Sequence, residues 1–428
     1  MKLAELNHLL IPRTKSDRDR LRNSLLGRSF APFASVAASS TPTGRAVVGL
    51  TLFAGMLVLG LDVDKTQAHV AFAGLSGLLL ACIVGHFVVN LQAVTVVVHA
   101  PRRAQTGERV QFAVSVTNHG TEPVRALQIR RPFLPWDGSW VDARPSIAEL
   151  APDTTTQAVC EAVFIGRGEH HLDAFEAAAL APFGLTLGRP VASGDVRLTV
   201  VPRIAPIARV TTPTTRKHHP GGVALASKTG ESMDLLGVRP YRPGDPMRAL
   251  HARSWAKRGA PVVREYEEEY FTRLGVIVDC DGTVSTPSQL EAALSLAAGI
   301  MARLSRGEAL IDLLVVGDTV HPLTIGRSLG HLDQALDRLA CVTSGPKLDG
   351  ERLLSRLAPH LSKLSAVLFV AFAWDPTRRA IAARIQRQGV GCQTFVVTRR
   401  GVRARPRSDE GVTEVTELAI AGEEPLVL

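Results

Sequence analysis

Two long apolar runs in the first quarter of the chain constrain its fold more than any other feature. They cover Ala46–Leu61 and Ala68–Leu91, and a short polar connection separates them. A helix needs about 20 apolar residues to cross a hydrocarbon core about 30 Å thick. The second run is long enough, and the first can recruit flanking small residues. The sequence therefore predicts a two-helix transmembrane hairpin over 46–91, and a first run that starts so far into the chain does not suit a cleaved signal peptide.

Charges at the two outer ends of this hairpin predict its orientation. Arg102 and Arg103 follow the second run, whereas the connection carries Asp62 and Asp64 against Lys65. The arm over 1–45 is basic through Lys2, Arg13, Lys15, Arg18, Arg20, Arg22, Arg28 and Arg45. Because basic flanks stay on the cytoplasmic side, both the N-terminus and everything after residue 95 are expected in the cytoplasm, with the hairpin in a bacterial inner membrane.

The rest of the composition fits that location. The formal net charge is +9, but much of the excess lies in the arm, and no basic stripe interleaved with aromatic residues predicts nucleic-acid binding. The odd number of cysteines, with no CxxC spacing, is typical of isolated thiols in a reducing compartment rather than of a disulfide framework. The five cysteines are Cys82, Cys160, Cys280, Cys341 and Cys392.

Residues 94–201 show the period of half-buried strands. β-branched residues occupy Thr95–Val98, apolar and polar residues alternate along Val110–Thr117, and Asn118-His119-Gly120 then predicts a turn. Further strand-like pieces follow at Ala126–Ile129, Thr156–Phe164 and Val196–Val201. Short strands at this spacing predict a small antiparallel β-sandwich of immunoglobulin-like type. A Pro-, Thr- and Gly-rich stretch over 202–230 is expected to be a linker.

Residues 271–428 alternate buried strands with amphipathic helices, which predicts a mostly parallel α/β sheet of Rossmann-like type. Expected strands are Leu274–Cys280, Ala309–Val316, Val367–Phe372 and Cys392–Val397, and expected helices are Gln289–Leu304, Gly330–Cys341, Arg352–Leu361 and Arg378–Gln388. In such sheets ligands bind at the carboxyl ends of the strands.

The end of the first of these strands carries an acidic motif with more than one interpretation. Asp279, Asp281 and Thr283 form D-x-D-G-T, as in haloacid dehalogenase-type phosphatases, in which the first Asp is the nucleophile. A von Willebrand A domain carries D-x-S-x-S here, a metal-ion-dependent adhesion site, and Asp375 after a later strand supplies its acidic residue. Oxygen ligands of this kind suit Mg²⁺. The carboxylates can also simply cap the helix that follows.

The block over 231–270 carries a second motif, and it resembles a known bacterial family. Its charged and turn-forming residues match the signature of the domain of unknown function 58 family, as do Arg167-Gly168 and Pro182–Leu185. The matching positions are Arg239, Tyr241, Pro243, Gly244, Asp245, Arg248, Arg264 and Glu265. The likeness covers about residues 40–428. It departs from the family pattern at Ala181, where Asp is usual, and at Ala252, where Trp is usual.

The resemblance implies a membrane-anchored protein with a von Willebrand A-like C-terminal domain. It also implies a MoxR-type AAA+ ATPase as a partner, and a transglutaminase-like membrane protein as a second one. No Walker A loop, catalytic Cys–His pair or serine nucleophile elbow is found in the sequence. We therefore expect a non-enzymatic scaffold that binds protein partners on the cytoplasmic side. The alternatives are a phosphatase that uses Asp279 and a metal-free structural tether.

Overall fold

The computed structural model describes residues 39–60, 66–142, 144–213, 235–243, 245, 247–266, 272–306, 309–317, 319–325, 329–399 and 411–428. Most of the predicted arm and linker, the turn of the hairpin and Gly244 lie outside these residues. The chain divides into two compact units. The first runs to Arg203 and includes Leu336–Val342, and the second holds Ile204–Ala335 and Thr343–Leu428.

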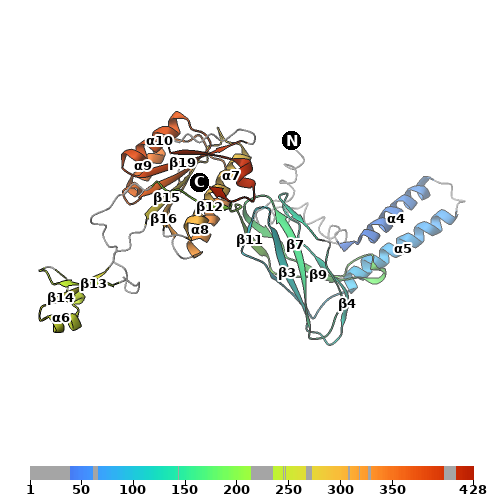
Figure 1. Ribbon diagram of the computed structural model, residues 1–428. Helices are drawn as coiled ribbons and strands as arrows, with labels where there is room; N and C mark the ends of the chain where they lie inside the picture. Colours follow the sequence, from blue (N-terminus) through green and yellow to red (C-terminus); the bar gives the residue numbers. More distant parts are fainter. Residues whose placement is uncertain are drawn as a thin grey trace. The chain divides into compact units, whose positions relative to one another are not determined.

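The predicted hairpin is present as two helices that run side by side (Figure 1). Helix α4 spans Pro42–Gly60 and helix α5 spans Thr66–Val88. Among the described residues these two are long and apolar enough to cross a membrane. Their apolar side chains are largely exposed, and Met56 and Leu59 reach 75% and 90% exposure. Apolar surface of this extent marks a contact with lipid or with another protein.

The β-rich part of the first unit is a sandwich, as predicted in outline. One sheet has the order β1-β3-β7-β5 and the second β10-β9-β4-β6, and a smaller third sheet is ordered β2-β11-β8. Burial alternates along the long central strands β3 and β7, so one face of each enters the core. All three sheets contribute to a common apolar core that includes the fully buried rings of Phe112, Phe164 and Phe175.

The strands of this unit have the following bounds: β1 Val94–His99, β2 Arg103–Gln105, β3 Arg109–Asn118, β4 Val124–Arg130, β5 Gly138–Trp140, β6 Ser146–Leu150, β7 Thr155–Phe164, β8 Gly168–Leu172, β9 Glu176–Ala179, β10 Val191–Ala192 and β11 Val196–Val201. The shorter strands β2, β5, β6, β8, β9 and β10 were not predicted. They carry too few residues to show a period of their own.

The second unit contains the predicted α/β sheet. Its strand order is β17-β16-β15-β18-β19-β20, and every pair is parallel except β16 with β17. Counted along the chain this order is 3-2-1-4-5-6, which places a topological switch point between β15 and β18. The bounds are β15 Thr272–Val278, β16 Ala309–Val316, β17 Thr319–Ile325, β18 Ala366–Ala371, β19 Gly391–Thr398 and β20 Val412–Thr416.

Helices cover both faces of this sheet (Figure 1). Helices α9 and α10 bury leucines and isoleucines against Ile277, Val367 and Phe369, which point to one face. Helix α7 packs against the strands, and α11 packs against α7. The helices are α7 Pro287–Leu304, α8 Leu329–Ala340, α9 Gly350–Leu361, α10 Pro376–Arg387 and α11 Glu417–Ala421. Each predicted helix of this region is present, and its bounds shift by at most a few residues.

Two further pieces belong to the second unit. Strand β12 (Ile207–Arg209) pairs in parallel with β21 (Leu426–Val427), so a segment predicted as linker is part of the α/β domain. The predicted signature block forms an antiparallel hairpin of β13 (Leu235–Pro240) and β14 (Val262–Tyr266). Its connection holds a short 3-10 helix, η2 (Met247–Ala249), and helix α6 (Ala252–Arg258).

Candidate functional site

The acidic residues singled out in the sequence meet at the switch point of the α/β sheet. Asp279 and Asp281 follow β15, and Asp375 follows β18, the strand paired with β15. The backbone N–H of Asp279 also donates to the carbonyl of Val370 at 2.9 Å, which keeps the ends of the two strands together. A crevice at this point of an open α/β sheet is where ligands bind in such folds.

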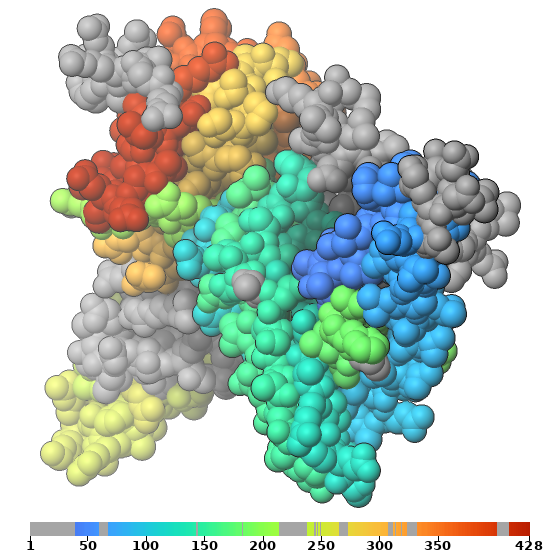
Figure 2. All heavy atoms as spheres, turned by 90° about the vertical axis from the view of Figure 1, so that its right-hand side faces the viewer, coloured from blue at the N-terminus to red at the C-terminus, as the bar shows by residue number. Residues whose placement is uncertain are grey.

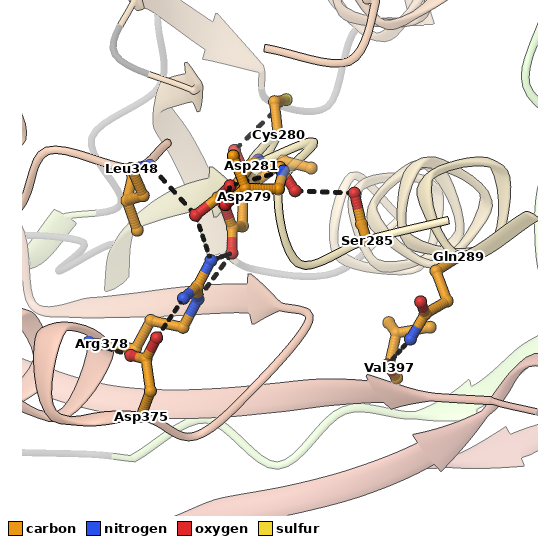
Figure 3. A network of polar contacts seen from close by, with 11 residues as sticks. Asp279, Cys280, Asp281, Ser285, Gln289, Leu348, Asp375, Arg378 and Val397 are labelled. Atoms are coloured by element: carbon orange, nitrogen blue, oxygen red, sulfur yellow. Dashed lines mark hydrogen bonds and ion pairs between the residues drawn. The ribbon is translucent and has the colours of Figure 1, made fainter. Parts of the chain in front are cut away.

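A buried guanidinium lies at the centre of these carboxylates (Figure 3). Arg378, in the first turn of α10, is 1% exposed. Its Nε and Nη2 donate to Asp279 Oδ2 at 2.7 and 2.6 Å, and its Nη1 donates to Asp375 Oδ2 at 2.6 Å. Nη2 also donates to Asp281 Oδ2 at 3.2 Å. One arginine therefore bridges the loops that follow β15 and β18, and we name Asp279, Asp281, Asp375 and Arg378 the arginine–aspartate cluster.

Local structure explains why Arg378 reaches this position. Asp375 is the N-cap of α10, and its Oδ1 accepts the backbone N–H of Arg378 at 2.9 Å. Pro376 occupies the first turn, where the missing N–H costs no helical hydrogen bond. The cap and the ion pair thus use the two oxygens of one carboxylate. The sequence analysis missed the role of this arginine, because it placed Arg378 only within the expected helix Arg378–Gln388.

Asp281 holds the loop after β15 in a fixed shape. Its Oδ1 accepts from the backbone N–H and the hydroxyl of Thr283, at 2.9 and 2.6 Å. Its Oδ2 accepts the backbone N–H of Leu348 at 3.0 Å. Gly282 leaves no room for a side chain, since an added Cβ would collide with Ser344. The hydroxyl of Thr283 is therefore used inside the loop, and Thr283 itself is exposed.

Burial and charge act in opposite directions on the cluster. Burial raises the pKa of Asp279, and the guanidinium of Arg378 offsets part of that rise. Burial also raises the pKa of Asp281, but hydrogen bonds from Thr283 and Leu348 outweigh it, so the pKa of Asp281 is lowered. Burial tends to lower the pKa of Arg378, yet the charges of Asp279 and Asp375 raise it overall. Arg378 is thus a permanent cation.

The magnesium site expected at these residues stays a prediction. The predicted ligands Asp279, Asp281 and Asp375 do converge, but the atom group between them is the Arg378 guanidinium. Over the part of the chain that the structure describes, no group of three or more His, Cys, Asp and Glu side chains is arranged to hold a metal ion. The guanidinium of Arg378 binds one oxygen of each of these three carboxylates.

The second predicted site, in the signature hairpin, is held by an internal ion pair. Arg239 donates to both oxygens of Asp245, from Nη1 at 2.7 Å and from Nη2 at 2.8 Å. Asp245 also accepts the backbone N–H of Arg242 at 2.8 Å, which closes the turn. Two of the signature residues thus bind each other, which favours a structural role for this pair.

The remaining signature residues are spread over the hairpin. The backbone N–H of Tyr241 donates to the carbonyl of Pro261 at 2.9 Å, and Pro243 lies in the turn. Arg248 in η2 and Arg264 in β14 are exposed. Glu265 pairs with Gly237 in the hairpin register. Trp255 of α6 and Met247 of η2, in the same hairpin, are exposed apolar side chains, and this mixture of cations and apolar residues is typical of a docking surface.

We predict that the Arg239–Asp245 pair withstands mild acid. Hydrogen bonds from Arg239 and Arg242 lower the pKa of Asp245 to about 2. The pair's contribution is therefore complete above the ordinary aspartate pKa of about 3.9 and is lost as the pH falls through about 2. A carboxyl ¹³C titration of the full chain, with Asp245→Asn to assign the signal, should show a midpoint well below that of an exposed aspartate. An ordinary midpoint would contradict the pairing.

Comparison with known proteins assigns this chain to no family and to no function. No family model matches the chain, and no curated protein matches it. Solved structures match in part. A fragment of native alpha-2-macroglobulin from Escherichia coli is 19% identical, with 28% of this chain and 18% of that chain covered, at a TM-score of 0.22. The CARDB domain of the PF1109 protein from Pyrococcus furiosus, in complex with di-metal ions, is 13% identical, with 25% and 87% covered, at 0.19.

The chain spans less than a fifth of the macroglobulin structure, and TM-scores of this size establish neither a fold nor an activity. The description of the strand order, the arginine–aspartate cluster and the signature hairpin therefore rests on the structure of this chain and not on these similar structures.

Proposed function

We propose that the protein is a non-enzymatic, membrane-anchored adaptor that binds a protein partner through its C-terminal α/β domain. The observation that carries this proposal is the buried guanidinium of Arg378, which fixes the two loops at the switch point in one conformation. Loops held in place at the carboxyl ends of the strands form a preorganised binding surface. Because the cation that holds the two loops together is an arginine of the protein, the binding surface forms without a metal ion.

Three features support a von Willebrand A-like identity for the domain. The sheet has a single antiparallel strand, β17, at its edge and acidic residues after β15 and β18. The sequence resembles the domain of unknown function 58 family, which implies a MoxR-type AAA+ ATPase as the partner and a transglutaminase-like protein as a membrane neighbour. Arg45 in the first turn of α4, and Arg102 and Arg103 after α5 and β1, favour the cytoplasmic side of a bacterial inner membrane.

The geometry disfavours the phosphatase alternative. A nucleophilic aspartate has to bring a free carboxylate oxygen to phosphorus. Asp279 is 1% exposed, its Oδ2 binds two guanidinium nitrogens, and its Oδ1 accepts the backbone N–H of Asp281 at 3.0 Å. Such a carboxylate is a structural anion. The D-x-D-G-T motif here orders a loop.

An assay of phosphate release tests this distinction. We expect the purified full chain, with Mg²⁺ and an aryl phosphate, to release no more phosphate than a buffer control. Asp279→Asn keeps the size of the side chain and removes its charge, so it should leave that background unchanged. Turnover in the wild type that Asp279→Asn abolishes would overturn the adaptor function in favour of the phosphatase.

A further inference from the structure

A short loop of the sandwich presents an exposed aromatic ring in a strained backbone conformation. The loop covers Ala181–Arg189 and contains a 3-10 turn, η1 (Pro182–Gly184). Phe183 in this turn is 75% exposed and has a φ of 67°. A bulky residue in the left-handed region is uncommon, and such strain persists only where the surroundings impose it. An exposed ring adds no apolar contact to the core of the sandwich, so packing in that core does not explain its position.

The surroundings that impose this conformation are the ends of the two apolar helices. Thr41, at the start of α4, donates its hydroxyl to the carbonyls of Gly184 and Leu185 at 2.9 and 3.0 Å. Gly44 in the first turn permits the approach, because a Cβ there would collide with the carbonyl of Leu185. The loop therefore lies directly against α4, and Figure 2 shows its green segment at the surface beside the blue helices.

The end of α5 holds the other half of the loop. The backbone N–H of Arg189 donates to the carbonyl of Val89 at 2.9 Å. His86 Nδ1 lies 2.7 Å from the carbonyl of Leu187, and the Thr186 hydroxyl donates to the carbonyl of Cys82 at 3.2 Å. Contacts to both helices therefore fix the position of the loop along the helix axes, at the end of the hairpin where α4 begins and α5 ends.

The charged and aromatic side chains at this end of the hairpin are of the kind found at the edge of a bilayer. Arg45 lies one turn inside α4, about 6 Å along the helix from Thr41. The guanidinium of Arg189 lies 5.5 Å from the ring centroid of Phe87, in the last turn of α5. Basic residues and aromatic rings at helix ends are typical of the zone between lipid headgroups and acyl chains. The exposed ring of Phe183 lies in a loop that contacts the same helix turns.

We propose that Phe183 inserts into the headgroup–acyl boundary and that the loop 181–189 is an interfacial anchor of the sandwich. The lipid surface is the occupant because the loop contacts the ends of α4 and α5, whose apolar side chains are exposed, as Leu50 of α4 and Val84 and Val88 of α5 show. The inference rests on the proposed membrane anchoring of the chain. Its consequence is that the sandwich is tied to the bilayer at a third point, besides the two helix ends.

Quenching by brominated lipid tests the position of the ring. We would place the full-length chain in phosphatidylcholine vesicles whose acyl chains carry bromine near the headgroup, and replace single phenylalanines by tryptophan. The signal of the native tryptophans is subtracted with the wild type. Phe183→Trp should lose most of its added fluorescence and shift its emission to the blue. Phe133→Trp is the matched control, because Phe133 is 77% exposed and follows the end of β4 farther from the loop.

A third variant separates this inference from the anchoring itself. Phe53→Trp reports on the middle of α4 and, in vesicles whose acyl chains carry bromine near their ends, should be quenched if the hairpin spans the bilayer. Quenching at Phe53→Trp without quenching at Phe183→Trp would overturn the interfacial anchor and leave the membrane hairpin standing. No quenching at either position would overturn both. Equal quenching at Phe133→Trp and Phe183→Trp would also overturn the specific role of the loop.

Tryptophan is larger than phenylalanine, so a cysteine that is labelled after the chain has folded guards against misfolding. Phe183→Cys, alkylated with an environment-sensitive fluorophore in a Cys341→Ser background, gives the same readout. Cys341 is the exposed cysteine of the described chain, and the other four are buried. A fluorophore at this position that emits as in water, in folded chain, would contradict the proposal.

Discussion

Replacing Arg378 by methionine is expected to destabilise the C-terminal α/β domain by about 3–5 kcal/mol. The substitution removes the cation from three carboxylates, of which Asp279 and Asp281 are 1% and 3% exposed. Removing one partner of a buried ion pair leaves an uncompensated charge in a poorly solvated place, and this costs more than the pair contributes to stability. Methionine fills much of the arginine's volume, so the loss reports on charge.

Thiol labelling localises this effect to the right domain. Cys280 and Cys392 are buried in the second unit, so their alkylation in urea follows the unfolding of that unit. The labelling midpoint should move to much lower urea in Arg378→Met. Arg379→Met is the matched control, because Arg379 is exposed and adjacent, and its free energy of unfolding should stay within about 0.5 kcal/mol of the wild type. Equal midpoints in the two variants would show that the cluster is not important for stability.

The second large effect expected is a gain of metal binding. Arg378→Ala leaves Asp279 Oδ2, Asp281 Oδ2 and Asp375 Oδ2 facing a space that the guanidinium filled, and hard cations prefer such oxygen ligands. We expect Mn²⁺ to bind this variant, and the urea midpoint of the variant to rise when Mn²⁺ is added. The wild type should show neither effect.

Electron paramagnetic resonance of free Mn²⁺ measures this gain directly, since bound Mn²⁺ loses its sharp signal. The double variant Asp279→Asn/Arg378→Ala removes one ligand and should bind more weakly than Arg378→Ala. Binding of Mn²⁺ by the wild type as tight as by Arg378→Ala would mean that the guanidinium does not exclude the metal, and that the site is a metal site after all.

Much of the fold follows from the sequence because long periodic segments define it. Strand β18 is entirely apolar and buried, and α9 places Leu353, Leu357 and Leu361 on one buried face. Strand β17 was missed because Pro322 and alternating polar residues hide it, and its pairing with β16 comes from tertiary context. Strand β12 was missed because its partner β21 is more than 200 residues away.

The candidate site was predicted only in part, and the reason is chemical. The likeness of the D-x-D-G-T segment to the acidic motif of a von Willebrand A domain was enough to expect that Asp279, Asp281 and Asp375 converge. The sequence did not predict their counter-ion, because an arginine three residues after a helix cap ordinarily points to solvent. The orientation of the first turn of α10 places the guanidinium of Arg378 beside Asp279, directly after β15. The signal that could have found it is a basic residue in the first helical turn, where the helix dipole disfavours a cation.

The central claim is that the loops at the switch point bind a protein partner without a metal, and crosslinked capture from native membranes tests it. Val284, in the loop after β15, is 41% exposed, so Val284→Arg should disrupt the surface without unfolding the domain. Val159→Arg, at a similarly exposed valine of the sandwich, is the control. We expect the wild type and Val159→Arg to capture an AAA+ ATPase, and Val284→Arg to lose it. Equal capture by all three, or capture by none, would contradict the proposed adaptor.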